Sequence, residues 1–384
     1  RLRTVFATVL VVLAGALPAP AHLHVQASAV GSVTIAWRDR ARGETRYEIH
    51  RAAAAVVRLP AGATRARVKG LRPGTRYRLR VRACRGASCG RTASIAVRTR
   101  RAGAAGGPSI GGCPVFRADN AWNRDVSHDP VDPNSDAYVR ALPGNLHPDF
   151  GSGRYGDYGI PITVVPQAQP LVPIRFTAYG DESDPGPYPI PGDARIEGGS
   201  DRHVLVVQQG TCRLYELFGA AHGAGSAWNA DAGALFDLRS NRSRPAGWTS
   251  ADAAGLPILP GLARAGEAAA GAIRHALRFT VRRTQKAYVD PARHFASSDT
   301  SPELPPMGLR FRLRASFDLA GFHGQALAIL EALRRYGMIV ADNGSNWYIS
   351  GAPDPRWNDD DIDQLKRVPG SAFEVVRPGP LHRG

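Results

Sequence analysis

Apolar and polar residues alternate strictly over short stretches of this chain, and this pattern constrains the fold most. Residues 273–281 carry Ile, His, Leu, Phe and Val in one row and mostly arginine, alanine and threonine in the other. Residues 309–314 alternate leucine or phenylalanine with arginine in the same way. A period of two is typical of antiparallel strands with one buried and one solvated face. The sequence therefore predicts a mainly β protein, with these arginines on the solvent side.

The first part of the chain, residues 22–100, consists of short alternating stretches between turn signals: VTIAW, RYEIH, ATRARV, RYRLRVRAC and IAVRTR. Their regular spacing predicts a β-sandwich. Trp37 lies in an early strand, Tyr47 in a middle one, and the run LxPGTxY extends from Leu71 to Tyr77. These features resemble a fibronectin type III module. The resemblance implies that Tyr77 is a corner tyrosine bonded to the upstream chain, and that the module is a spacer or docking unit.

The chain opens with arginines, an apolar run from Val5 to Leu17 and an A-x-A sequence that ends at Ala21. A basic start, an apolar run of about 7–15 residues and an A-x-A site are typical of a secretory signal. The run is too short to span a bilayer as a helix. We therefore expect residues 1–21 to be a signal peptide, and the protein to be secreted with no membrane span after cleavage.

The chain has four cysteines, which in an exported protein favour disulfides over metal or thiol chemistry. Cys84 and Cys89 flank a short loop and are predicted to bond to each other. Cys113 and Cys212 then form the second pair by elimination. This second bond would tie the start of the larger domain to its central hairpin.

A Gly/Ala/Ser-rich segment, residues 101–112, separates the first module from residues 113–384. Its composition without periodicity predicts a linker. Strand patterns dominate the larger domain, so we expect an antiparallel, sandwich or barrel-like fold with a few short helices. One helix is predicted at residues 324–336, before Gly337, and another at residues 359–366, which begin with acidic residues.

The net charge of +16 belongs to the smaller module. Residues 22–112 hold 19 Lys and Arg against three acidic residues, whereas residues 113–384 hold 28 against 30. An alternating series lies along one predicted strand: Arg76, Arg78, Arg80 and Arg82. This stripe is either a solvated face or a surface that holds an anionic polymer at low salt. Because we expect export, the predicted partner is an anionic wall polymer or acidic polysaccharide rather than nucleic acid.

The segment from Asp181 to Phe218 combines an acidic, proline-rich loop with a hairpin. The turn is expected at residues 208–211. This register places His203 opposite Glu216, and opposed residues lie about 4.5–5.5 Å apart at Cβ. Such a pair is either half of an acid/base site or a buried pair that only fixes the register.

Three further residues are candidates for the same site. His275 lies in the apolar row of its strand, so it is either a core histidine or meets His203 at one cleft. Asp237 follows Leu235 at a period of two and is expected to point inward, where desolvation raises the pKa of a general acid. The alternative for Asp237 is a bond to the backbone or to an arginine. Asp184, in the acidic loop, is another carboxylate near this cleft.

Five of the six tryptophans lie in the larger domain: Trp122, Trp228, Trp248, Trp347 and Trp357. Flat aromatic rings stack on the apolar faces of sugars. Trp228, Trp248 and Trp347 are therefore predicted to bind substrate, together with Tyr215 and Asp184. The alternative for each tryptophan is packing in the core.

The chain carries no GxSxG, HExxH, P-loop or dinucleotide-binding motif, and we predict no metal and no cofactor. The leading hypothesis is a secreted glycoside hydrolase acting on an extracellular or cell-wall polysaccharide. Glu216 and Asp237 would be its carboxylate pair, tuned by His203 and His275. One alternative is a polysaccharide lyase that uses one of these histidines as base and Tyr215 as acid. The other is a non-catalytic glycan or cell-wall binding protein.

Residues 247–279 look similar to a family of secreted bacterial proteins without a named activity, so this similarity assigns no residue roles. The enzymatic hypothesis requires His203, Glu216 and His275 to converge in one open hollow. If these side chains are scattered, or sealed beneath packed neighbours, recognition of a glycan replaces catalysis as the expected function.

Overall fold

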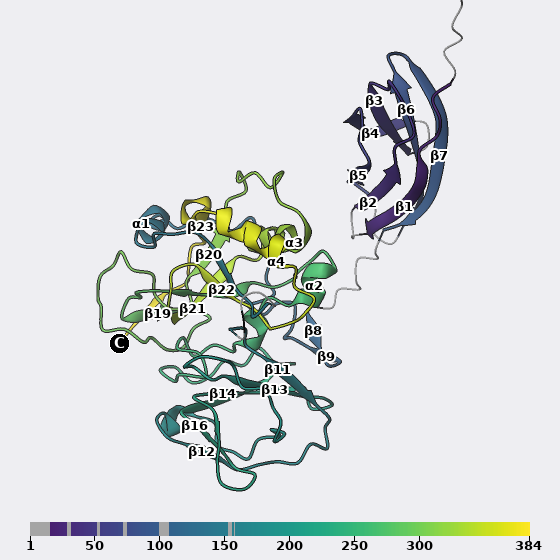
Figure 1. Cartoon of the computed structure of the whole chain (residues 1–384). Helices are drawn as coiled ribbons and strands as arrows, with labels where there is room; N and C mark the ends of the chain where they lie inside the picture. The colour runs from purple at the N-terminus through teal and green to yellow at the C-terminus, as the bar shows by residue number, and fades with distance from the viewer. Residues whose placement is uncertain are drawn as a thin grey trace, which may run out of the picture. The chain divides into compact units, whose positions relative to one another are not determined.

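The computed structural model describes most of the chain (Figure 1). The described residues are 16–28, 32–51, 54–71, 75–99, 107–152, 156 and 158–384. The chain forms two compact units, Arg1–Ala105 and Gly106–Gly384. Within the described ranges, no helix is long and apolar enough to cross a membrane.

The smaller unit is a sandwich of two antiparallel sheets (Figure 1). One sheet has the order β1-β2-β5 and the other has the order β4-β3-β6-β7. Their bounds are β1 Ala21–Ser28, β2 Val33–Arg38, β3 Arg46–Arg51, β4 Ala54–Pro60, β5 Arg65–Val68, β6 Arg76–Arg85 and β7 Ser88–Arg98. The sandwich predicted from the alternating stretches is therefore confirmed.

Alternate residues of facing strands fill the core of this sandwich. Ile35, Ile49, Leu79 and Val81 are fully buried, and the ring of Trp37 lies 5.4 Å from that of Tyr47. Residues 72–74 of the LxPGTxY run lie outside the described residues. The predicted hydrogen bond of the Tyr77 hydroxyl therefore stays a prediction.

The sandwich also uses residues that precede the expected cleavage point. Leu17 packs into its core, and the Leu17 carbonyl accepts a 2.9 Å hydrogen bond from the backbone N–H of Arg91. Ala21 is the first residue of β1 and pairs with Arg38. Residues 1–15, which hold most of the predicted signal segment, lie outside the described residues.

Both predicted disulfides are confirmed. Cys84 and Cys89 join β6 to β7, with Cα atoms 4.0 Å apart. Cys113 and Cys212 join the start of the larger unit to its central hairpin, with Cα atoms 5.3 Å apart. The second bond closes a loop of about 100 residues, which restricts the unfolded chain strongly.

Three sheets build most of the larger unit, with the orders β10-β22-β18-β21-β20-β23, β11-β13-β14-β17 and β12-β16-β15. Two short pairs, β8-β9 and β19-β24, complete its strands. The bounds are β8 Ser109–Ile110, β9 Cys113–Pro114, β10 His147–Asp149, β11 Ile162–Val165, β12 Ile174–Phe176, β13 Val204–Gln208, β14 Arg213–Phe218, β15 Ala221–His222, β16 Trp228–Ala230, β17 Ala232–Asp237, β18 Leu277–Val281, β19 Ala287–Val289, β20 Arg310–Leu313, β21 Met338–Asn343, β22 Tyr348–Ser350, β23 Phe373–Val375 and β24 Leu381–Arg383.

The larger unit is mainly β, as predicted, with short helices between its strands. Most strand pairs are antiparallel, but β10–β22, β11–β13, β12–β16 and β18–β21 are parallel. The α-helices are α1 Ser135–Arg140, α2 Ala265–Ala269, α3 Gly324–Arg335 and α4 Asp359–Ile362. The 3-10 helices are η1 Gly180–Glu182, η2 Leu259–Gly261, η3 Asp363–Arg367 and η4 Gly370–Ala372. The helix predicted at residues 324–336 is α3, which ends before Gly337, whose φ is 71°, whereas the helix predicted at residues 359–366 is α-helical only in α4 and continues as the 3-10 helix η3.

The arginine rows of β18 and β20 were predicted to face solvent, and this prediction is wrong for Arg278, Arg310 and Arg312. All three side chains are buried. Arg310 donates hydrogen bonds to the carbonyls of Ala121 and Tyr336, and Arg312 donates to those of Val126 and Asp129. Because the segment before α1 covers Arg310 and Arg312, their guanidinium groups bond to backbone carbonyls instead of water, whereas Arg278 bonds to Asp252 and Ser350.

Candidate functional site

The central hairpin consists of β13 and β14, and its register differs from the predicted one. Leu205 lies opposite Glu216 and Val207 opposite Leu214, so His203 is not opposite Glu216. The turn begins one residue later than expected, because Cys212 has a φ of 53° and donates its N–H to the Gln208 carbonyl. A shift of two residues in register preserves the face of each strand. His203 and Glu216 therefore share a face of the hairpin but are not paired.

Glu216 is fully buried and bonds to the backbone. Its carboxylate accepts hydrogen bonds of 2.9–3.0 Å from the N–H groups of Ile258 and Leu259, at the start of η2. Burial raises the pKa of Glu216 to about 7, although these hydrogen bonds oppose the shift. The side chain has no exposed surface. Glu216 therefore anchors residues 258–259 to the sheet and has no route to a substrate.

His203 is also buried, with 3% of its surface exposed. Its Nδ1 bonds to the Glu197 carboxylate, and its Nε2 lies 2.9 Å from the Ala251 carbonyl oxygen. Burial opposes the charge on the imidazole, but the hydrogen bond and the charge of Glu197 outweigh it and raise the pKa of His203. A carbonyl oxygen only accepts, so Nε2 carries a proton. His203 is therefore a donor to two fixed partners rather than a free base.

His275 lies just before β18 and belongs to a different network. It is fully buried, and its Nε2 lies 3.1 Å from both the Glu267 carboxylate and the Arg264 guanidinium. Burial opposes ionisation of Glu267, but Arg264 and His275 hold the pKa of Glu267 down to about 2. Within the described residues, no hydrogen bond or ion pair joins His275 to His203. The structure therefore does not bring the two histidines together at one cleft.

The predicted carboxylates beside this cleft have other roles. Asp237 is exposed at the end of β17 and accepts a 2.9 Å hydrogen bond from the backbone N–H of Arg239. The prediction that it points inward is wrong, because β17 ends at Asp237, whose side chain is exposed, whereas Leu235 packs against the core. Asp184 accepts a 2.8 Å hydrogen bond from the Leu235 N–H and pairs with Arg244. It fixes the acidic loop to β17.

Most of the predicted aromatic binding residues lie in the core. Trp347 is fully buried against Phe373 and donates its indole N–H to the Leu142 carbonyl. Trp228 is 1% exposed, and Tyr215 packs with its ring 5.0 Å from that of Tyr188. Trp122 and Trp357 are buried as well. Only Trp248 among the five is half-buried, and the Arg244 guanidinium lies 5.5 Å from its ring.

A charged cluster missed in the sequence lies where β18 and β21 approach residues 197–203 and 250–252. Arg278 is its centre, and its guanidinium lies 3.0 Å from the Asp252 carboxylate and 3.6 Å from that of Asp342. It also donates a 2.7 Å hydrogen bond to the Ser350 hydroxyl. Burial raises the pKa of both aspartates, although Arg278 opposes the shift. The acidic residues come from distant parts of the chain, so no local motif indicates the cluster.

Asp149, at the end of β10, lies at the edge of this cluster. Burial and the nearby charge of Glu197 raise the pKa of Asp149 to about 6, while Arg278 opposes the shift. No hydrogen bond or ion pair to its carboxyl group occurs among the described residues. Its side chain is half-buried, in contrast to Glu216 and His203. Asp149 is therefore the carboxyl group of the cluster that is best placed to exchange a proton with a ligand.

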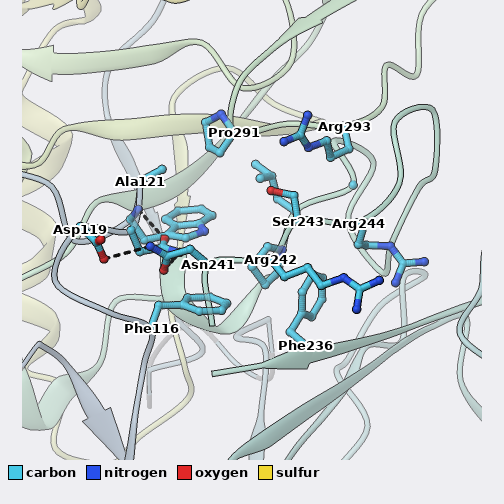
Figure 2. A pocket seen from close by; sticks show the side chains of 15 residues that line it. Phe116, Asp119, Ala121, Phe236, Asn241, Arg242, Ser243, Arg244, Pro291 and Arg293 are labelled. Atoms are coloured by element: carbon cyan, nitrogen blue, oxygen red, sulfur yellow. Dashed lines mark hydrogen bonds between the residues drawn. The ribbon is translucent and has the colours of Figure 1, made fainter. Parts of the chain in front are cut away.

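A pocket of about 150 Å³ lies elsewhere on the larger unit (Figure 2). Phe116, Trp122 and Phe236 supply aromatic walls, and the charged groups are those of Asp119, Arg242, Arg244 and Arg293. Figure 2 shows Phe116 and Phe236 on one side and Pro291 and Arg293 on the opposite side. Sequence reasoning missed this pocket because its walls come from four separate loops and one strand.

One group of three potential metal ligands occurs in the part of the chain that the structure describes: Glu48, Cys84 and Cys89. The two sulfur atoms are bonded to each other, so neither is a thiolate. Arg82 and Arg46 hold the pKa of Glu48 down to about 2. We interpret this group as a structural ion cluster on the smaller unit.

Comparison with known proteins identifies the smaller unit. Residues 18–100 match the fibronectin type III domain family. This segment is a fibronectin type III domain. The match begins at residue 18, three residues before β1. No curated protein matches the chain.

Solved structures that are similar to the chain also contain fibronectin type III domains. The FN1–FN3 domains of chicken CNTN1 are 23% identical, with a TM-score of 0.21, over 22% of this chain and 32% of that one. A two-domain segment of chicken tenascin is 19% identical, with a TM-score of 0.20, over 22% and 51%. The FN3 domain of human collagen XX is 22% identical, with a TM-score of 0.20, over 22% and 92%. The matched segment thus spans about a third of the CNTN1 chain.

Proposed function

We propose that this protein is secreted and that its larger unit recognises an extracellular or cell-wall glycan. The pocket between Phe116, Trp122 and Phe236 carries this proposal, because aromatic walls with convergent polar groups suit sugar rings. The burial of His203, Glu216 and His275 favours recognition over the catalytic roles predicted for them. The two disulfides are compatible with an oxidising, extracellular location.

Affinity electrophoresis of the full chain through gels that contain bacterial or plant cell-wall polysaccharides tests this proposal. We expect at least one polysaccharide to retard the protein. Replacement of Ser243, which is exposed and lines the pocket, by tryptophan should fill the pocket and abolish the retardation. Ser226→Trp, at an exposed position outside the pocket, is the matched control. No retardation by any polysaccharide, or equal retardation of both variants, would contradict the proposal.

The fibronectin type III domain contributes a docking surface for an anionic polymer. Arg76, Arg78 and Arg80 are exposed on one face of β6, and Arg98 lies opposite Arg76 on β7. Arg82, in the same row, is paired with the buried Glu48. The exposed arginines therefore leave this face cationic, which suits an anionic wall polymer or acidic polysaccharide.

Hydrolysis of glycosidic bonds is a second candidate function, and Asp149 favours it. A half-buried carboxyl group with a pKa of about 6 beside a second carboxylate is the arrangement of a glycosidase acid with its partner. Asp149 would donate the proton to the leaving oxygen, and Glu197 would be the partner. These two residues replace Glu216 and Asp237 in the predicted roles.

Reducing-end release from a retarding polysaccharide separates hydrolysis from binding alone. A hydrolase should lose about 10²-fold or more of its activity in Asp149→Asn, because general acid catalysis contributes about 10²–10⁴-fold. The exposed Asp237→Asn is the control and should retain activity. Since Asp149 must be protonated, activity should fall as the pH rises above about 6. The hydrolase candidate is rejected if no polysaccharide yields reducing ends.

The lyase alternative lacks the groups it needs. A lyase requires a base that reaches a sugar proton, but both nitrogens of His203 face fixed partners, and His275 is sealed. Tyr215, the predicted acid, packs against Tyr188. Absorbance near 235 nm, which an unsaturated uronide produces, should therefore not increase.

A further inference from the structure

We infer that the pocket binds a sugar that carries a carboxylate, namely a uronic acid residue of the glycan. The inference rests on the proposed glycan recognition and names the class of ligand. It is carried by the side-chain groups that line the pocket, among which donors without a protein partner outnumber acceptors without one. Four of these groups form the donor set: the Arg242 guanidinium, the Arg293 Nε–H, the Ser243 hydroxyl and the Trp122 indole N–H.

Three side-chain acceptor atoms of the pocket are occupied by protein donors. The Asp119 Oδ1 accepts hydrogen bonds from Arg117 at 3.1 Å and from Asn241 at 2.9 Å, and Figure 2 shows the second of these, whereas the Asp119 Oδ2 has no donor among the described residues. The side-chain Oδ1 of Asn241 accepts from the Asn120 side-chain amide at 3.1 Å, and the side-chain Oδ1 of Asn120 accepts from the Trp122 backbone N–H at 3.0 Å. A ligand that mainly donates hydrogen bonds therefore finds few free acceptors here.

The donor set, in contrast, has no partners within the described residues. The Arg293 Nε is buried and unpaired, which leaves a polar atom without the hydrogen bond that burial normally requires. The structure likewise gives no acceptor to the Arg242 guanidinium, the Ser243 hydroxyl or the Trp122 indole N–H. Such a set matches a ligand rich in acceptors, and a carboxylate is an acceptor with two oxygens.

Arg242 supplies the uncompensated charge of the pocket. Arg244 is paired with Asp184, and Arg293 is paired with Asp290 through a 3.2 Å contact. Asp119 is paired with Arg117. Arg242 is exposed and lacks an acidic partner among the described residues. One positive charge thus remains for one negative charge on the ligand, and hydrogen bonds between charged groups are about twice as strong as neutral ones.

The aromatic walls and the volume of the pocket fit one ring of a glycan. A cavity of about 150 Å³ is the size that holds one benzene molecule, so at most one sugar ring enters it. Phe116, Trp122 and Phe236 line the pocket with 2–5% of their surface exposed, so they offer the ring a small apolar area, and the Arg244 guanidinium lies 5.9 Å from the Phe236 ring and so holds that wall in place. We therefore expect the pocket to bind one sugar residue, with the rest of the polymer outside it.

Ligand-observed NMR titrations of the full chain with methyl glucuronide, methyl glucoside and glucose 6-phosphate test the inference. We expect the glucuronide to bind at least about tenfold more tightly than the glucoside at low salt. Arg242→Gln should remove this preference and leave glucoside binding unchanged. Arg213→Gln, which removes an exposed arginine outside the pocket, is the matched control and should retain the preference.

Three results would overturn the inference. Equal affinities for the glucuronide and the glucoside would refute it and leave glycan recognition intact. Tighter binding of glucose 6-phosphate than of the glucuronide would assign the pocket to phosphorylated sugars instead. If none of these sugars binds at the pocket while a polysaccharide still retards the protein, the recognition site lies elsewhere.

Discussion

At the scale of single residues, burial separates the ionisable groups that stabilise the larger unit from those that can meet a ligand. The side chains of Glu216 and His203 are hydrogen-bonded to buried protein groups. Those of Asp149 and Arg242 have no hydrogen-bond partner among the described residues. A buried carboxylate without its backbone donors would cost several kcal/mol. We therefore expect substitutions at Glu216 to change stability rather than ligand binding.

The pH dependence of stability in Glu216→Gln tests this assignment. The folded state raises the pKa of Glu216 to about 7, so it holds the proton more tightly than the unfolded chain. The contribution of Glu216 to stability therefore falls as the pH rises from about 4.5 through about 7, by roughly 3 kcal/mol in total. Urea unfolding should show that the free energy of unfolding of Glu216→Gln rises relative to that of the original protein when the pH is changed from 5 to 8.

Glu216→Leu is the second variant for this test. It removes the acceptor of two backbone N–H groups and should cost about 1–3 kcal/mol for each unsatisfied group at either pH. Identical pH profiles for the original protein and Glu216→Gln would show that this carboxyl group does not titrate as described.

At the scale of elements, the sequence predicted where strands and helices form better than it predicted which of their faces are exposed to solvent. Both disulfides, α3 and the β-rich class followed from spacing and composition, because these depend on neighbours along the chain. The hairpin register did not, since Cys212 joins the turn under the constraint of its bond to Cys113. The arginine face of β20 was also mispredicted, because alternation cannot reveal a distant segment that covers a strand.

Removal of a buried arginine tests this description of β20. Arg312→Ala would remove the guanidinium that lies 2.7 Å from the Glu374 carboxylate. It would also leave the backbone carbonyls of Val126 and Asp129 without this hydrogen-bond donor. Loss of one partner from a buried ion pair costs about 3–5 kcal/mol. Denaturant unfolding should therefore show a large loss of stability, compared with less than about 0.5 kcal/mol for the exposed Arg213→Ala. Equal effects would mean that the face of β20 is solvated after all.

The candidate site was only partly accessible to sequence reasoning. His203 was predicted as a catalytic partner of Glu216, but it is buried and bonds to Glu197 and to the Ala251 carbonyl instead. Asp149, Asp252 and Arg278 lie far apart in the sequence, and their proximity depends on how the sheets pack. The pocket around Arg242 depends in the same way on loops from distant segments. Residue type therefore identified candidate ionisable groups, but it could not predict which of these groups lie close together in the fold.

At the scale of the whole molecule, charge is divided between the two units. The fibronectin type III domain holds almost all the excess positive charge, whereas the larger unit is close to neutral. A charged face attracts an anionic polymer over long distances but discriminates little between sugars. A pocket binds one sugar at short range and can be selective for it. We infer that the domain raises affinity for an acidic glycan and that the larger unit supplies selectivity.

Salt dependence separates these two contributions. Retardation by an acidic polysaccharide should weaken markedly between 50 and 500 mM salt, since the Debye length falls well below about 10 Å above 0.1 M. A triple glutamine variant of Arg76, Arg78 and Arg80 should lose most of this salt dependence. The control replaces the same number of exposed arginines elsewhere on the domain: Arg38, Arg40 and Arg42. If the two triple variants behave alike, only net charge matters and β6 is not a docking surface.

The most direct test of glycan recognition is a crystal structure of the full chain with an oligouronide bound. We predict one sugar ring between Trp122 and Phe236, with its carboxylate within hydrogen-bond distance of Arg242. A sugar bound at another place on the larger unit, with this pocket left without one at saturating oligouronide, would contradict it.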